Sequence, residues 1–65
     1  MTEYELCIFK DEEGSEWEGV NRSFRDARRE ARRHVLERGA LMVQILNLET
    51  QLVEMNIYPG YEVRP

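Results

Sequence analysis

The chain has 65 residues, of which 42% are hydrophobic and 34% charged, and its formal net charge is −4. This length allows one small domain and excludes a nucleotide-binding domain joined to a substrate domain. The single cysteine, Cys7, excludes an internal disulfide and any site built from several cysteines. No apolar run approaches the ~18 residues of a membrane span. The opening residues Met1-Thr2-Glu3 lack the basic residues of a targeting signal. We therefore expect a cytoplasmic domain without a membrane partner.

The first two predicted elements form a hairpin. Polar and apolar side chains alternate over residues 3–9, which is typical of a strand. Residues 10–15 are polar and include Gly14, so they are predicted to form a turn. A second strand is predicted over residues 16–20, with Trp17 as its inward-facing anchor.

A helix is predicted to begin at Ser23 and to end near Arg38. The Ser23 side chain can accept a hydrogen bond from the amide of Asp26. Gly39 is suited to the left-handed conformation that follows a helix. At 100° per residue the apolar side chains fall on one narrow stripe, which comprises Phe24, Ala27, Ala31 and Val35. The stripe predicts that the helix packs on a sheet.

Two further strands are predicted over residues 41–47 and 52–58, joined by a tight hairpin at 48–51. Residues 59–65 contain a Pro-Gly pair and are expected to form a C-terminal tail. The expected fold is therefore α+β, with the element order β-β-α-β-β in a single domain over residues 1–58. We expect a mostly antiparallel sheet of three to four strands with one amphipathic helix on one face.

One helix covers only one face of a sheet, so the other face stays open. Strand alternation places Val53 under the helix and six large apolar side chains on the open face. These six are Phe9, Met42, Leu46, Leu48, Leu52 and Tyr58. Exposed apolar patches of this size usually mark contact surfaces, and small domains often complete a core with a second chain. We expect this face to form a homodimer or to bind another protein.

Charge is unevenly distributed along the chain, and the first 18 residues contain seven acidic residues and one basic residue. The acidic segment of the first hairpin consists of Asp11, Glu12, Glu13, Glu16 and Glu18. Such a cluster can imitate a row of phosphates and bind a basic protein, as small acidic phage proteins do. The alternative interpretation is a solvated turn that only aids solubility.

The helical region has the opposite charge, with seven arginines and three acidic residues over 19–39. Acidic residues that lie three or four positions from an arginine on the helix can pair with it and neutralise part of this charge. They leave three arginines without a local partner: Arg25, Arg28 and Arg32. These three either meet the acidic first hairpin or bind a partner's anions. The three arginines favour nucleic-acid binding as the alternative function. The sequence pI of about 4.9 opposes nucleic-acid binding. A genomic bias toward arginine codons is another explanation for the arginines.

The sequence lacks a catalytic constellation. Cys7 is interpreted as a small apolar strand residue, and His34 as a boundary histidine paired with Glu30 one turn earlier. Nothing in the sequence reproduces a zinc-ligand spacing or a phosphate-binding loop. We therefore expect no catalytic residue, metal, cofactor or small-molecule substrate. The predicted function is a non-enzymatic protein–protein interaction module that regulates or inhibits a larger complex, for example one that handles nucleic acid.

Overall fold

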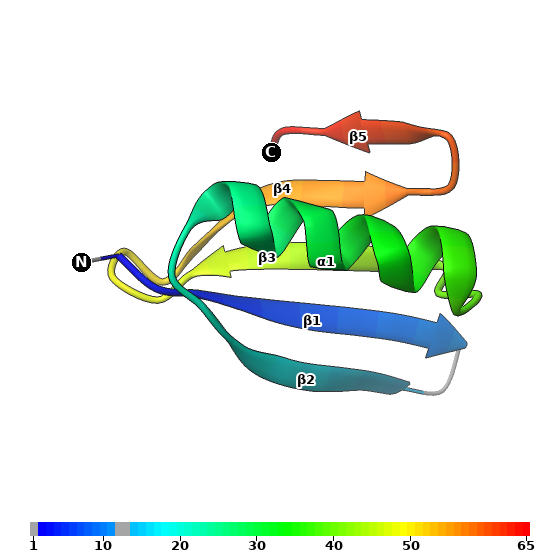
Figure 1. Cartoon of the computed structure of the whole chain (residues 1–65), viewed down its shortest axis with the longest axis horizontal. Coiled ribbons are helices and arrows are strands. Elements are labelled where there is room, and N and C mark those ends of the chain that lie inside the picture. Colours follow the sequence, from blue (N-terminus) through cyan, green and yellow to red (C-terminus); the bar gives the residue numbers. More distant parts are fainter. Residues whose placement is uncertain (1, 12–13) are drawn as a thin grey trace.

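The computed structural model describes residues 2–11 and 14–65, which form one helix and five strands (Figure 1). The elements are β1 (Tyr4–Asp11), β2 (Gly14–Asn21), α1 (Phe24–Glu37), β3 (Met42–Asn47), β4 (Leu52–Tyr58) and β5 (Tyr61–Val63). The strands form one sheet in the order β2-β1-β3-β4-β5, and all neighbours are antiparallel. The α+β class with one helix is therefore confirmed, whereas the expected count of three to four strands is wrong.

The additional strand lies in residues 59–65, the segment expected to be a tail. Gly60 adopts a φ of 90°, which closes a turn that glycine makes without steric cost. Tyr58 and Tyr61 pair across this turn, and their rings stack with centroids 4.7 Å apart. A strand of three residues is too short to show an alternating pattern, so the sequence carried no period-two signal for it.

The helix begins and ends where the sequence predicts. The Ser23 Oγ accepts a hydrogen bond from the Asp26 amide at 3.1 Å, and Arg38 is the C-cap residue. Gly39 follows with a φ of 74°. The predicted stripe faces the sheet, since Ala27 and Ala31 are fully buried.

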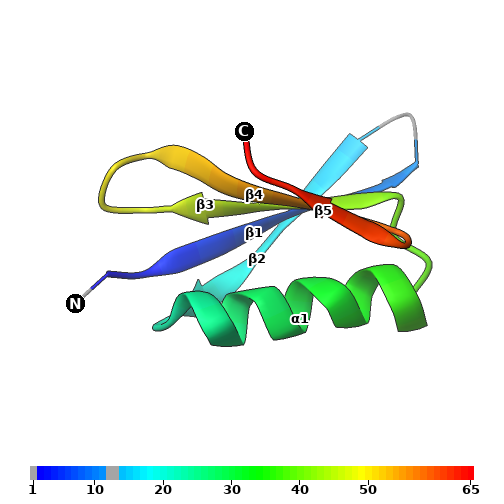
Figure 2. The same cartoon turned by 90° about the horizontal axis from the view of Figure 1, so that it is seen from above.

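The hydrophobic core lies between α1 and one face of the sheet. Figure 2 shows the helix along that face, and none of the described elements covers the opposite one. The core consists of Leu6, Ile8, Ala27, Ala31, Val35, Ala40, Val43, Ile45, Met55 and Ile57. The two alanines in the stripe let the helix approach the sheet closely, and larger side chains from the three central strands fill the layer.

A bulge in β2 reverses the predicted orientation of its aromatic residue. The register between β1 and β2 shifts at Gly19, so Trp17 lies opposite Cys7 and Glu18 opposite Leu6. Cross-strand partners share one face of a sheet, and Leu6 belongs to the core. Trp17 is therefore on the open face, with 58% of its surface exposed, and the prediction that it points inward is wrong.

A second bulge has the same effect in β4. Ile45 pairs with Met55, but the next residue of β3, Leu46, pairs with Val53, so Glu54 is the extra residue. Leu52 then lies opposite Asn47, on the helix side of the sheet at the end of the hairpin. Strand alternation had suggested the reverse positions for Leu52 and Val53.

Candidate functional site

The open sheet face has no covering element in the described part of the chain. One row of cross-strand partners crosses all five strands and carries no charged side chain. The row consists of Trp17, Cys7, Gln44, Asn56 and Val63. Cys7 at its centre is buried, whereas Trp17 and Val63 at its ends are exposed. The face is thus neutral along its middle and most accessible at its two edge strands.

Large apolar side chains lie on both sides of this row. By register and strand alternation, the open sheet face also carries Phe9, Val20, Met42, Leu46, Val53, Tyr58 and Tyr61. Val20 and Tyr61 are more than half exposed, while those on the central strands are half-buried by their neighbours. Such a surface resembles half of a β-sandwich interior.

Of the six apolar residues predicted for this face, the strand pairing places four on it. These four are Phe9, Met42, Leu46 and Tyr58. Leu48 lies half-buried in the β3–β4 turn, where its amide donates to the Glu3 carbonyl at 2.9 Å. Leu52 lies on the opposite side. Sequence reasoning missed Trp17 and Tyr61, because their positions depend on a bulge and on a short strand without a local signal.

The predicted anion-binding arginines are partly occupied within the chain. Arg28 Nε donates to Glu62 Oε1 at 2.7 Å, and Arg32 Nε donates to Glu62 Oε2 at 2.6 Å. These bonds anchor β5 to the helix. Arg25 is exposed, and among the described residues it forms no ion pair, nor does Arg29.

A shallow groove of about 510 Å³ lies on the helix surface beside these arginines. It is lined by Phe24, Arg25, Arg28, Arg29, Arg32, Arg33, Leu36 and Glu37. The groove combines guanidinium groups with the apolar side chains of Phe24 and Leu36. This combination suits an anion that carries an apolar group. Two of its cations are already paired with Glu62, which weakens the attraction for an external anion.

The carboxylate of Glu62 links the pH of the solution to the attachment of β5. Burial opposes its ionisation, but hydrogen bonds from Arg28 and Arg32 and their charges outweigh burial and hold its pKa below the usual value. A lowered pKa in the folded state stabilises the fold above the unfolded value of 4.5, and this stabilisation is lost as pH falls through the folded pKa.

We predict that Glu62→Gln lowers the free energy of unfolding by about 1 kcal/mol at pH 7, because two charge-assisted hydrogen bonds to half-exposed arginines are lost. The difference between the two proteins should shrink as pH falls below 4.5 and should disappear once the pH is below the lowered pKa of the native carboxyl, which is then protonated. Urea denaturation at a series of pH values measures it. The control is Glu37→Gln, which removes one exposed helical pair with Arg33 and should cost no more than ~0.5 kcal/mol.

The acidic segment does not form one uniform surface. Glu16 forms an ion pair with Lys10 at 3.1 Å, and Glu18 turns toward the helix. Asp11 lies at the end of β1, and Glu12 and Glu13 lie outside the described residues. β1 extends to Asp11 and β2 begins at Gly14, so residues 10, 11, 14 and 15 belong to strands and not to the turn predicted over residues 10–15.

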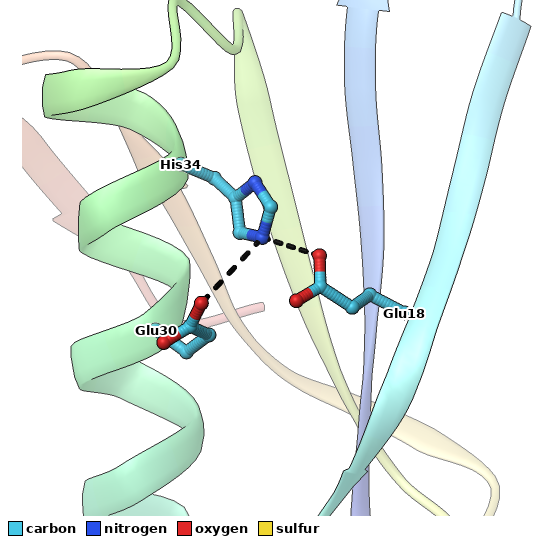
Figure 3. Close-up of side chains that lie close together, drawn as sticks. All are labelled: Glu18, Glu30 and His34. Carbon is cyan, nitrogen blue, oxygen red and sulfur yellow. Dashed lines mark ion pairs between the residues drawn. The ribbon is translucent and has the colours of Figure 1, made fainter.

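Glu18, Glu30 and His34 meet between β2 and α1 (Figure 3). The His34 Nε2 lies 2.5 Å from Glu18 Oε2 and 3.9 Å from Glu30 Oε1. The His34 ring is buried, whereas the Glu18 side chain is 41% exposed and the Glu30 side chain 28% exposed. The sequence suggested the proximity of His34 to Glu30, but Glu18 was assigned to the acidic segment because the bulge at Gly19 was not foreseen.

No protein-family model, curated protein or solved structure matches this chain. Its function is therefore inferred from the surfaces described above. The part of the chain that the structure describes includes no helix long and apolar enough to cross a membrane.

Proposed function

We propose that this chain is a non-enzymatic interaction module that pairs with a second copy of itself through the open sheet face. The observation that carries the proposal is the set of large apolar side chains on that face, from Trp17 on β2 to Val63 on β5, on either side of the polar residues Gln44 and Asn56 in the middle of its central row. Two sheets stacked on these faces would form a β-sandwich about 10 Å thick. The two helices would lie on its outer surfaces.

Charge favours a second copy as the occupant. The chain carries a formal net charge of −4, so two copies repel one another unless they meet through a neutral surface. The central row of the open sheet face has no charged side chain, so repulsion between two copies there is confined to neighbouring positions such as Glu5, which lies between Val20 and Leu46. Burial of apolar side chains such as Trp17 then supplies the favourable free energy.

The size of the face is also compatible with a dimer. Strands of 8, 8, 6, 7 and 3 residues, about 4.8 Å apart and with ~3.4 Å per residue, present a projected area of roughly 520 Å². Side-chain relief increases the area that becomes buried. A standard stable interface buries about 800 Å² on each partner, so most of this face must take part.

The dimer is proposed to regulate or inhibit a larger cytoplasmic complex that handles nucleic acid. Each protomer would present the arginine groove of α1 together with Glu16 and Glu18 of the acidic segment away from the interface, since these two acids lie opposite Ile8 and Leu6 on the helix side of the sheet. Two copies of these surfaces would bind a partner through charge, with strong dependence on salt concentration.

A second candidate function is nucleic-acid binding through α1. It is favoured by Arg25 and Arg29, which form no ion pair within the described residues and line the same groove. Arg28 and Arg32 add less because Glu62 neutralises part of their charge. Titration with a DNA duplex at increasing salt separates the two functions, because phosphate contacts give binding that weakens steeply with salt.

Trp17 offers a direct test, because it is the only tryptophan of the chain and lies on the proposed interface. Dilution from about 1 mM to about 1 µM should shift its emission to longer wavelength as the dimer separates and water reaches the indole ring. An emission maximum that stays constant over this range, at the position of a solvent-exposed indole, would contradict self-association through this face.

A further inference from the structure

We propose that Glu18, Glu30 and His34 form a binding site for a zinc ion that ties the edge strand β2 to α1. Their three candidate ligand atoms lie within 4.8 Å of one another (Figure 3). The site is on the helix side of the sheet, so it is separate from the proposed dimer surface and does not depend on it.

The donor set and the spacing suit zinc. Imidazole nitrogen and carboxylate oxygen bind Zn²⁺ at about 2.0–2.2 Å, and three protein ligands with one water form a common tetrahedral arrangement. Ligand atoms of such a tetrahedron are about 3.3 Å apart. The distances from His34 Nε2 to Glu18 Oε2 and Glu30 Oε1, 2.5 and 3.9 Å, bracket this value. Small rotations of the two carboxylates would therefore admit the ion.

The three side chains differ in how firmly they are held. The His34 ring is buried, which restricts the movement of its Nε2. Glu30 lies one helical turn before it on the same side of α1, and the bulge at Gly19 directs Glu18 toward the same point from β2. Both carboxylates are partly exposed, which gives an ion and its water a path to the site.

Arg38 is the group that an incoming ion must displace. Its Nη1 lies 3.1 Å from His34 Nε2 and 3.3 Å from Glu30 Oε1. One ring nitrogen cannot donate to Glu18 and accept from Arg38 at the same time. Arg38 can therefore leave the cluster while the contact between His34 and Glu18 is kept. Its side chain is 45% exposed at the end of α1 and can turn into solvent, which leaves two carboxylates and one imidazole for the cation.

Zinc at this site would fix β2, which is an edge strand. Among the ion pairs of residues 2–11 and 14–65, the pair of Glu18 with His34 is the one that joins β2 to α1. Trp17, which directly precedes Glu18 in β2, lies on the other face of the sheet. Its fluorescence would therefore report ion binding without contact between the indole ring and the metal.

Calorimetric titration of the metal-free protein with ZnCl₂ tests the site. We expect one ion per chain, and binding weakened at least about tenfold in His34→Gln and in Glu18→Gln because each loses a ligand. Arg38→Gln should bind zinc several-fold more tightly, because a positive charge near the ion is removed. The matched control, Glu16→Gln, removes an acid from the same strand outside the cluster and should leave the affinity unchanged.

Two outcomes would overturn the proposal. One is the absence of zinc binding in both the native protein and Arg38→Gln at concentrations up to about 1 mM. The other is equal zinc binding by the native protein, Glu18→Gln and His34→Gln, which would place the ion elsewhere. Because Glu18 and Arg38 are partly exposed, their variants keep the test decisive even if His34→Gln unfolds. Loss of zinc binding leaves the dimer proposal intact, since sedimentation measures the dimer independently.

Discussion

Replacement of Ile45 by alanine is expected to lower the free energy of unfolding by about 2–5 kcal/mol. Ile45 is fully buried in β3, between β1 and β4 and beneath the helix. The alanine stripe of α1 leaves the core volume to be filled by such sheet residues, so the helix offers no large side chain at this stripe to close the cavity. A domain of this length has a total stability of only about 3–10 kcal/mol. The substitution should therefore remove a large part of the total stability.

Urea denaturation followed by circular dichroism measures this change. The control is Leu36→Ala, which removes a similar number of carbon atoms from a helical side chain that is 74% exposed. It should change the free energy of unfolding by no more than ~0.5 kcal/mol. Equal losses in the two variants would show that the core does not lie where α1 meets β3.

The double substitution Trp17→Arg with Tyr61→Arg is expected to weaken self-association about 100-fold or more. The two residues lie on opposite edge strands of the open sheet face, and each is 58% exposed. The monomer therefore keeps its core, while the dimer would bury two new charges from each protomer without partners. Sedimentation velocity at several protein concentrations measures the shift from dimer to monomer.

A matched control changes the charge equally on the helix side. Leu36→Arg with Leu52→Arg also adds two positive charges at exposed leucines, and it should leave the dimer intact. The control also tests the register of β4, since alternation alone would place Leu52 on the open sheet face. If both double variants dissociate the dimer to the same extent, charge rather than the open face determines association.

The sequence was sufficient for the elements whose signals are local. Ser23 and Gly39 mark the two ends of the helix by side-chain capping and by a positive φ. The spacing of Ala27 and Ala31 identifies its buried side. The central strands could be predicted because each has one core-facing row of apolar residues, such as Val43 and Ile45.

The remaining features depend on contacts between residues distant in sequence. A bulge places the side chains on one side of it on the opposite face from the one that strict alternation gives, which is why Trp17, before Gly19, and Leu52, before Glu54, were assigned to the wrong sides. The short strand β5 also depends on distant residues. It is stabilised by the bonds from Arg28 and Arg32 to Glu62, 34 and 30 residues away. No pattern within a short window contains that information.

The same limit applies to the candidate sites. The approach of Glu18 to His34 joins residues 16 positions apart through a bulge, so a search for ligand spacing along the sequence does not find it. The open sheet face was partly predicted, because Phe9, Met42 and Leu46 lie on β1 and β3, which pair with each other without a register shift. Its accessible edges at Trp17 and Tyr61 could be found only from the strand pairing.

Sedimentation equilibrium of the unmodified chain tests the central claim, self-association through the open sheet face, most directly. At a chain concentration near 100 µM, above the micromolar dissociation constants of typical transient dimers (about 1–10 µM), we predict a mass twice that of the 7.8 kDa chain. The mass of a single chain at every concentration up to about 1 mM would contradict it.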